Sequence, residues 1–433
     1  KASNKMKIKK VDAYEILDSR GTPTVAARVI LENDMEEFGL VPSGASTGSK
    51  EAVEKRDEGD SFDGKGVQGV IKDAEKSFFP EFIGMDVENQ IEIDSKIIEL
   101  DGTTNKAKVG ANITLALSLA VCKAAAAAEK KKLYLYINSL FKNFFGTNVQ
   151  MKMPLPMMNI LNGGAHANNG LDFQEFMIQP VGFSSFKKGL TCGVEVFNSL
   201  KETLNKKKFS TAVGDEGGFA PEISSSEEAL SLISEAILSS GYKVEDEVTF
   251  ALDCASTEIF DDGSYIFSDN KKLSSEELIN YLKELSKSYP ITSIEDALDE
   301  NDWLGWNHLT KEMGKETQLV GDDLFVTNKD IFQEGIQQNI ANSILIKINQ
   351  IGTLTETLET INLAKENNYT TVISHRSGET EDSFIADLAV GSGAGQIKTG
   401  APSRSDRTSK YNRLLMIDAW ENFEFLGRNE LNQ

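Results

Sequence analysis

The sequence predicts an α/β protein in which a C-terminal β/α barrel follows a smaller N-terminal α+β domain. Six short runs rich in Ile, Leu, Val and Thr occur in the last two-thirds of the chain. Most are separated by one amphipathic helical segment, at a spacing of roughly 25 residues or more, which is typical of strands alternating with helices in a parallel sheet. A closed barrel is the simplest such sheet, and it brings the C-terminal ends of all its strands to one mouth.

Each of the six runs also finishes in a residue that can do chemistry. These residues are Asp253, Glu295, Asp322, Lys347, His375 and Lys398. In a barrel they converge in one small volume, although they are scattered along the chain. Three carboxylates at one mouth repel each other unless a cation lies among them, so the pattern indicates a metal-dependent enzyme.

Length and charge narrow the class of protein. The chain has 433 residues, of which 40% are hydrophobic, enough for two domains or for one large barrel with an appendage. Its net charge of −22 disfavours nucleic acid as a partner, because phosphate backbones need a basic surface. An anionic substrate stays possible, since a metal and a few local Lys and Arg can invert the field inside a pocket.

The cysteines and the apolar segments favour a reducing compartment and no membrane. There are three cysteines without a C-x-x-C spacing, so neither a disulfide framework nor a zinc site is indicated. The most apolar window, residues 112–128, contains Lys123 and mostly small residues, which favours a buried helix over a membrane span. The basic first ten residues lack the apolar stretch of a signal peptide, and we expect a cytoplasmic protein.

The N-terminal domain is expected to cover residues 1–143. Residues 9–20, 22–32 and 36–42 read as strands of an antiparallel meander, with a hairpin turn at Asn33-Asp34. A Gly- and Ser-rich loop at 42–52 follows as a candidate lid, and the pattern from residue 51 to about 132 is helical. Residues 144–433 then form the barrel domain.

The three acids at strand ends are a set of hard oxygen ligands. Carboxylates without accompanying Cys favour Mg²⁺, Mn²⁺ or Ca²⁺ over zinc. Helix N-caps or salt bridges at strand ends are the alternative for any one of them. Three acids on successive strand ends make that alternative much weaker.

The two lysines suggest a base and a neighbouring cation. Lys347 lies between Ile346 and Ile348 in an apolar strand. If it points into the barrel, burial and nearby cations should lower its pKa and make it a base. Lys398, one strand after His375, is such a cation or a binder of a substrate carboxylate, while a solvent-facing strand position is the plain alternative for Lys347.

Polar loops supply further candidates. His375, Arg376 and Ser377 follow one strand directly, and Arg, Ser and backbone amides together form a good phosphate cradle. Glu216 lies between glycines beside Asp215, an acid that could raise its pKa and suit it to general-acid catalysis. An ordinary capped loop and a tight acidic turn are the respective alternatives.

Two more segments bear on the site. The Gly-rich stretch 162–176 holds His166, Gln174 and Glu175, and a lone His in such a loop is more often structural than catalytic. The loop at 42–52 contains Ser46, whose hydroxyl could reach a metal, but no GK[ST] follows, so it is no phosphate-binding Walker loop.

Seven motifs together resemble the enolase family, over about residues 11–413. They are DSRG-x-PT (18–24), VPSGASTG (41–48), VGDEGG (213–218), SIED (293–296), GDDLFVTN (321–328), SHRSGETED (374–382) and GQIKTG (395–400). The resemblance implies a modified, TIM-like β/α barrel with an N-terminal meander-plus-helices domain. It also implies a glycolytic hydro-lyase that reversibly dehydrates 2-phospho-D-glycerate to phosphoenolpyruvate with two Mg²⁺ ions per active site.

The resemblance also implies roles for individual residues. Lys347 would be the base at C2 and Glu216 the general acid at the departing hydroxyl. The tighter Mg²⁺ would be held by Asp253, Glu295 and Asp322, and the second would be reached by Ser46. The substrate-binding residues would be Ala45, Ser46, Gln174, Arg376, Ser377 and Lys398, with Glu175, His166 and His375 supporting catalysis. A cytoplasmic homodimer or higher oligomer is implied, acting on a small phosphorylated three-carbon substrate.

Departures from the family pattern are few. Thr22 stands where Asn is usual, and Ala297 where Gly or Pro is common. Two rivals remain at this stage. A related barrel racemase or cycloisomerase would carry two lysines in K-x-K on one strand, whereas this strand carries only Lys347. A structural or adhesive role of the same fold is the other, and the intact acid, base and metal ligands favour catalysis.

Overall fold

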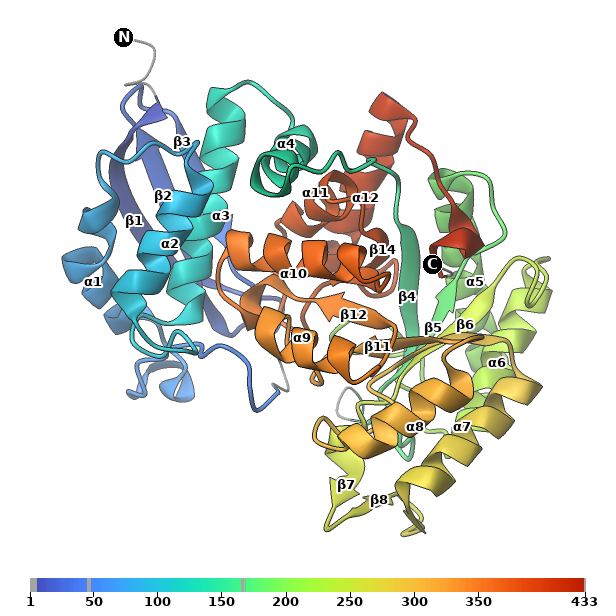
Figure 1. Cartoon of the computed structure of the whole chain (residues 1–433). Helices are drawn as coiled ribbons and strands as arrows, with labels where there is room; N and C mark the ends of the chain where they lie inside the picture. The colour runs from blue at the N-terminus through green and yellow to red at the C-terminus, as the bar shows by residue number, and fades with distance from the viewer. Residues whose placement is uncertain (1–5, 45–47, 165–166, 168, 432–433) are drawn as a thin grey trace.

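The computed structural model describes residues 6–44, 48–164, 167 and 169–431 of the chain. An N-terminal sheet and its helices lie beside a closed barrel whose strands are surrounded by helices (Figure 1). This architecture confirms the fold class expected from the sequence.

The N-terminal domain is an antiparallel meander covered by helices. Its strands are β1 (Ile8–Leu17), β2 (Pro23–Leu31) and β3 (Glu36–Leu40), paired in that order. Its helices are α1 (Gln68–Ser77), α2 (Gln90–Asp101), α3 (Ala111–Ala128) and α4 (Leu133–Phe145). The small side chains of α3 allow close approach to the sheet: at Gly39 of β3, an added Cβ would collide with the backbone of Ala116. Only a glycine fits at that crossing.

Helix α3 is the one element in the described part of the chain that is long and apolar enough to cross a membrane. Its 18-residue window has a mean hydropathy of 1.6 and is 83% buried inside the protein. It packs among α2, α4 and the sheet as a core helix, as the small residues and Lys123 predicted.

The eight-stranded barrel closes in the order β10-β11-β12-β13-β14-β4-β5-β6. Its strands are β4 (Leu155–Asn162), β5 (Glu175–Gln179), β6 (Thr249–Asp253), β10 (Ile291–Glu295), β11 (Gln318–Gly321), β12 (Ser343–Ile346), β13 (Thr370–Ser374) and β14 (Gly395–Lys398). The runs that ended in chemical residues are all barrel strands. Strand β5 departs from the expected parallel arrangement, because it pairs antiparallel with both β4 and β6.

Eight helices accompany the barrel strands in the part of the chain that the structure describes. They are α5 (Phe186–Lys206), α6 (Ser226–Ser239), α7 (Ser275–Ser288), α8 (Trp303–Met313), α9 (Lys329–Gln337), α10 (Leu354–Glu366), α11 (Phe384–Gly391) and α12 (Ser405–Glu421). A small sheet of β7 (Phe260–Asp261), β8 (Ser264–Ile266) and β9 (Lys272–Leu273) projects below the barrel in Figure 1. Several helices start at side-chain caps that the sequence contains, such as the capping box of Ser274 and Glu277 at α7.

The barrel interior is built in layers because strand side chains alternate with a period of two. The lowest layer is polar: Gln396 donates to Gln318 at 2.7 Å, and Gln318 donates to Ser293 at 3.0 Å. The next layer is apolar and consists of Met157, Met177, Ala251, Val320, Leu345 and Val372. Two residues further along several of these strands the interior becomes charged, which places the functional side chains at the mouth.

The expected helical pattern from residue 51 to 132 is wrong in its first part. Residues 51–59 carry no helix, and α1 starts at Gln68. Their backbone bonds elsewhere instead: Val53 donates to the carbonyl of Asn105, and Asp57 to that of Gly66. Long-range pairing therefore replaced the local helical bonds in this segment.

Candidate active site at the barrel mouth

Four charged side chains meet at Lys398, the last residue of β14. Its Nζ lies 2.5 Å from Glu175, 3.0 Å from Glu295 and 3.2 Å from Asp253. All four are buried. Lys398 thus partly neutralises three acids that come from three different strands, and it stands within the acid cluster.

The three acids of this cluster differ in pKa. Burial raises the pKa of Glu175 and Glu295 well above the usual value, and neighbouring acids add to this. Burial also opposes ionisation of Asp253, but Lys398 and hydrogen bonds from Glu175 and Glu295 lower its pKa to about 2. The pKa of Lys398 is raised because the surrounding acids outweigh its own desolvation. The cluster therefore holds more acid groups than its single ammonium can neutralise.

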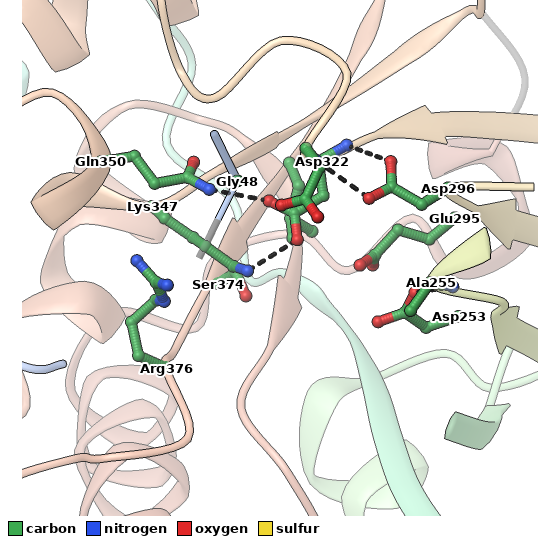
Figure 2. A network of polar contacts seen from close by, with 12 residues as sticks. Gly48, Asp253, Ala255, Glu295, Asp296, Asp322, Lys347, Gln350, Ser374 and Arg376 are labelled. Carbon is green, nitrogen blue, oxygen red and sulfur yellow. Dashed lines mark hydrogen bonds and ion pairs between the residues drawn. The ribbon is translucent and has the colours of Figure 1, made fainter. Parts of the chain in front are cut away.

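Lys347 is partly buried at the mouth, with its side chain 14% exposed, as its place in an apolar strand suggested. Its Nζ donates to Asp322 at 2.7 Å (Figure 2), and Gln350 donates to the other oxygen of Asp322 at 2.9 Å. The expected lowering of the pKa of Lys347 is wrong. Burial does lower the pKa, but the adjacent Asp322 more than compensates and raises it above the usual value.

Glu216 forms the centre of a second polar group. Asn159 of β4 donates to Glu216 at 3.2 Å and to Glu175 at 3.0 Å, so it bridges the two carboxyl groups. His375 Nε2 lies 3.1 Å from Glu216, and Ser377 donates to its other oxygen at 3.3 Å. Burial lowers the pKa of His375 to about 3, despite the opposing charge of Glu216, so the imidazole is neutral at pH 7.

Glu175 of β5 is an acid that interacts with Glu216, while the effect expected of Asp215 on Glu216 stays a prediction. A hydrogen bond and like-charge repulsion from Glu216 both raise the pKa of Glu175. Asp215 is partly exposed, and its carbonyl accepts a hydrogen bond from Arg407 at 3.1 Å. Two buried carboxyl groups in contact are well suited to share one proton.

Arg376 and Ser377 follow β13 and face the same cavity. Arg376 is buried, and its Nη1 donates to Glu51 at 2.8 Å and to Asn349 at 2.9 Å. The cavity is also lined by Gln174, whose buried Oε1 accepts no hydrogen bond within the described structure. Its free volume is about 30 Å³, so a ligand would have to replace some of the ion pairs that now fill the mouth.

The predicted metal ligands fall into two neighbouring acidic groups. Asp253 and Glu295 lie with Glu175, and Asp322 lies with Asp296 and Asp323; each group could hold a metal ion by ligand type and spacing. The carboxylates of Asp253 and Glu295 point toward the side of the mouth from which Lys347 extends (Figure 2). The donors are hard oxygens, which fit Mg²⁺. Three expected site residues, Ala45, Ser46 and His166, lie outside the described residues.

Asp296 was missed by the sequence reasoning, although it follows Glu295 directly. Its two carboxylate oxygens accept from the backbone N–H groups of Asp322 and Asp323 at 2.8 and 2.9 Å. Asp296 therefore fixes the backbone that carries Asp322. The only sequence signal was an acid of no obvious role beside a predicted ligand.

Strained backbone supports the mouth. Positive φ angles occur just after three strands, at Ala255 (43°), Asp296 (44°), Val326 (44°) and Thr327 (55°). The last two are β-branched, for which this region is costly. At this backbone angle the Thr327 hydroxyl donates to the Gln350 side chain at 2.8 Å and accepts from the backbone N–H of Lys347 at 3.0 Å. The strained turn thus links the residues around Asp322.

Comparison with family models agrees with this arrangement. Residues 8–137 match the enolase N-terminal domain, and residues 150–432 match the enolase C-terminal TIM barrel domain. Together the two matches cover almost the whole chain, and the second contains every described strand of the barrel. With its lysines, acids and arginine gathered at the barrel mouth, this chain belongs to the enolase family.

Proposed function

We propose that this protein is a glycolytic enolase, which reversibly dehydrates 2-phospho-D-glycerate to phosphoenolpyruvate with Mg²⁺. The observation that carries the proposal is the separation of two proton-transfer groups in one cavity. Lys347 is held by Asp322, while Glu216 belongs to the group of Glu175 and His375. One reaction can therefore use a base and an acid that do not neutralise each other.

The chemistry demands such a pair. The C2 proton lies beside a carboxylate, so its removal places a second negative charge on an already anionic group. We assign this step to the amine of Lys347. Because Asp322 raises the pKa of Lys347 and stabilises its ammonium form, Lys347 would act as a base when the charge of Asp322 is engaged by another cation. The neutral form then takes the proton from carbon.

Departure of the C3 hydroxyl needs a proton donor. Glu216 is buried, and its contact with Glu175 favours a protonated carboxyl group in the pair. Neutral His375 and Asn159 fix the orientation of Glu216. We assign Glu216 as the general acid, with Glu175 as the group with which it shares the proton.

The acid set would hold the metal. Asp253, Glu295 and Asp322 supply the hard oxygens, and the excess of acid over ammonium near Lys398 favours a divalent cation. Bound Mg²⁺ would supply positive charge to the substrate carboxylate. Two ions per site remain part of the proposal, and Ser46 is its candidate residue for the second ion. Lys398 would add its own charge beside the carboxylate.

Arg376 and Ser377 would bind the phosphate, since both line the cavity and Arg suits bidentate recognition of phosphate oxygens. The proposal also includes a cytoplasmic homo-oligomer without nucleic-acid or membrane partners. The family membership supports the dimer, which sedimentation of the purified protein would test.

Hydrogen exchange at C2 tests the assignment of base and acid. In deuterated buffer with Mg²⁺, proton NMR of 2-phosphoglycerate should show that Lys347→Ala loses both turnover and exchange. Glu216→Gln should lose turnover but keep exchange, because the base remains. Each loss should be on the order of a hundredfold or more.

The opposite pattern would reverse the roles, and a wild-type protein that neither exchanges C2 hydrogen nor forms phosphoenolpyruvate would refute the function. Lys329→Ala is a matched control, because this exposed lysine pairs with Glu359, neither residue lines the cavity, and the change should affect neither rate.

A further inference from the structure

Arg376 is held on one side by a carboxylate that the catalytic scheme does not use. Its Nη1 lies 2.8 Å from Glu51 Oε1 and 2.9 Å from Asn349 Oδ1. The side chains of Arg376 and Glu51 are 3% and 5% exposed. An Nη1 group carries two N–H donors, and these two acceptors engage both of them. Nη2 of Arg376 also donates to the second oxygen of Glu51, Oε2, at 3.5 Å.

Glu51 is itself fixed before any ligand arrives. Its second oxygen, Oε2, accepts from the backbone N–H of Gly48 at 2.6 Å, and its own N–H donates to the Gly48 carbonyl at 3.1 Å. The next residue, Ala52, donates to the carbonyl of Gln350 at 2.9 Å. The carboxylate is therefore clamped by its own turn and cannot swing away without breaking several hydrogen bonds.

The opposite edge of the guanidinium is closely bounded by backbone. A Cβ at Gly44 would collide with Arg376 Nη2 and Cζ, so the absence of a side chain there admits the guanidinium. Gly44 and Arg376 both line the cavity. The plane of the Arg376 guanidinium in the cavity is thus set by Glu51 and Asn349.

We propose that Glu51 is a positioning residue for anion recognition: it holds the guanidinium of Arg376 in the orientation in which it meets the phosphate of the substrate. The inference rests on the proposed function for the identity of that substrate. The orientation of a buried guanidinium by Glu51 does not depend on which phosphorylated substrate is bound. A buried Arg left without its acid would be both unpaired and free to rotate.

The alternative hypothesis is that the Glu51 carboxylate is a stand-in for phosphate: it occupies the phosphate position on Arg376 and is displaced when the substrate binds. The two readings predict opposite changes. A stand-in competes with the ligand, so its removal should strengthen phosphate binding. A positioning residue prepares the cation, so its removal should weaken phosphate binding.

Steady-state kinetics of Glu51→Gln and Glu51→Ala with 2-phosphoglycerate separate the readings. We expect KM to rise about tenfold in Glu51→Gln, the equivalent of one charge-assisted hydrogen bond, with kcat changed less than about threefold. Glu51→Ala should show a larger rise, because Gln keeps an acceptor for Nη1. An unchanged or lower KM in both variants would overturn the proposal.

The control is Glu300→Gln. Glu300 is a buried acid that accepts from the Ser49 hydroxyl at 3.0 Å, next to the same turn. It should leave KM within about twofold. An equal rise in both Gln variants would indicate general anchoring of the turn and would overturn the specific role of Glu51.

A second readout does not depend on turnover. Phenylglyoxal modifies arginines, and mass spectrometry of the peptide containing Arg376 reports how much inorganic phosphate is needed to protect it. We expect about tenfold more phosphate for Glu51→Gln than for the wild type. Equal protection in folded variants, checked by circular dichroism, would refute the inference. If the wild type fails to dehydrate 2-phosphoglycerate but the protection still shifts, the proposed function fails and the role of Glu51 stands.

Discussion

Replacement of Lys398 by Met should destabilise the protein strongly at pH 7 and far less at pH 5. The ammonium is the one cation within 3.2 Å of Glu175, Asp253 and Glu295 among the described residues. At an effective dielectric constant of about 20, each contact near 3 Å corresponds to roughly 5 kcal/mol of Coulomb energy. Adding the three Coulomb energies would overstate the loss of stability in Lys398→Met, because the acids can take up protons once the ammonium is removed.

Proton uptake sets the magnitude. Neutralising one carboxyl group of ordinary pKa costs about 3.5 kcal/mol at pH 7 and about 1 kcal/mol at pH 5. Glu175 and Glu295 already have raised pKa values, so they are the groups that would accept the proton. We therefore expect Lys398→Met to lower the free energy of unfolding by about 3–5 kcal/mol at pH 7, the usual range for breaking a buried ion pair.

The sign of the pH dependence follows from linkage. In the variant, the acids have folded-state pKa values raised above those of the unfolded chain. Their stability is then complete below the unfolded pKa, near 4, and is lost as the pH rises through the folded pKa. The deficit relative to the wild type should grow from about 1–2 kcal/mol at pH 5 to its full value at pH 7.

The assay is equilibrium unfolding in urea, with a chelator present, followed by circular dichroism at both pH values. Lys329→Met is the control, because its partner Glu359 is a surface acid and exposed pairs contribute under about 1 kcal/mol. A deficit that is equal at pH 5 and pH 7, or no larger than that of the control, would refute the view that Lys398 neutralises the acid cluster.

Three further outcomes are expected. Calorimetry without substrate should show one tight Mg²⁺ site per chain, which Asp253→Asn should abolish; two equally tight sites would contradict the ligand assignment. Asp94→Ala should lower the free energy of unfolding by about 2–4 kcal/mol in urea titrations. The reason is that buried Asp94 accepts from the backbone N–H and the hydroxyl of Thr355 at 2.9 and 2.6 Å. The control is Asp34→Ala, which should change this free energy little because Asp34 is exposed and pairs with the surface residue Lys9. Burial and Lys152 lower the pKa of Lys365 to about 8, so the folded protein favours the neutral amine. The contribution of this amine to the free energy of unfolding is therefore present above pH 10.5 and is lost as the pH falls from 10.5 to 8. Lys365→Met should then gain about 1–2 kcal/mol at pH 7 but nothing above pH 10.5, and a loss at pH 7 would contradict this.

Much of the site could be predicted because local sequence controls where strands end. The β-branched runs before Asp253, Glu295, Asp322 and Lys398 are all barrel strands, with these residues at or just after their ends. The period of two along a strand then turns them inward, over the apolar layer that contains Ala251 and Val320. Closure of the barrel brings the ends together regardless of their separation along the chain.

Other features needed the tertiary structure. Glu175 starts its strand and would belong to the far end of a parallel barrel, but β5 runs in the opposite direction and brings it to the mouth. No local pattern distinguishes a parallel from an antiparallel neighbour in a short apolar run.

The sequence by itself determined the fold class and the acids at the strand ends, because these follow from periodicity and strand length, but it left open whether Lys347 points inward. The tertiary structure alone decided the electrostatics: Asp322 raises the pKa of Lys347, and Glu51 orients Arg376 from 325 positions away in the chain. Coulomb energies depend on distances of a few ångströms between elements. Such distances are set only when the whole chain has packed, so they cannot be predicted from residues that are neighbours in the sequence.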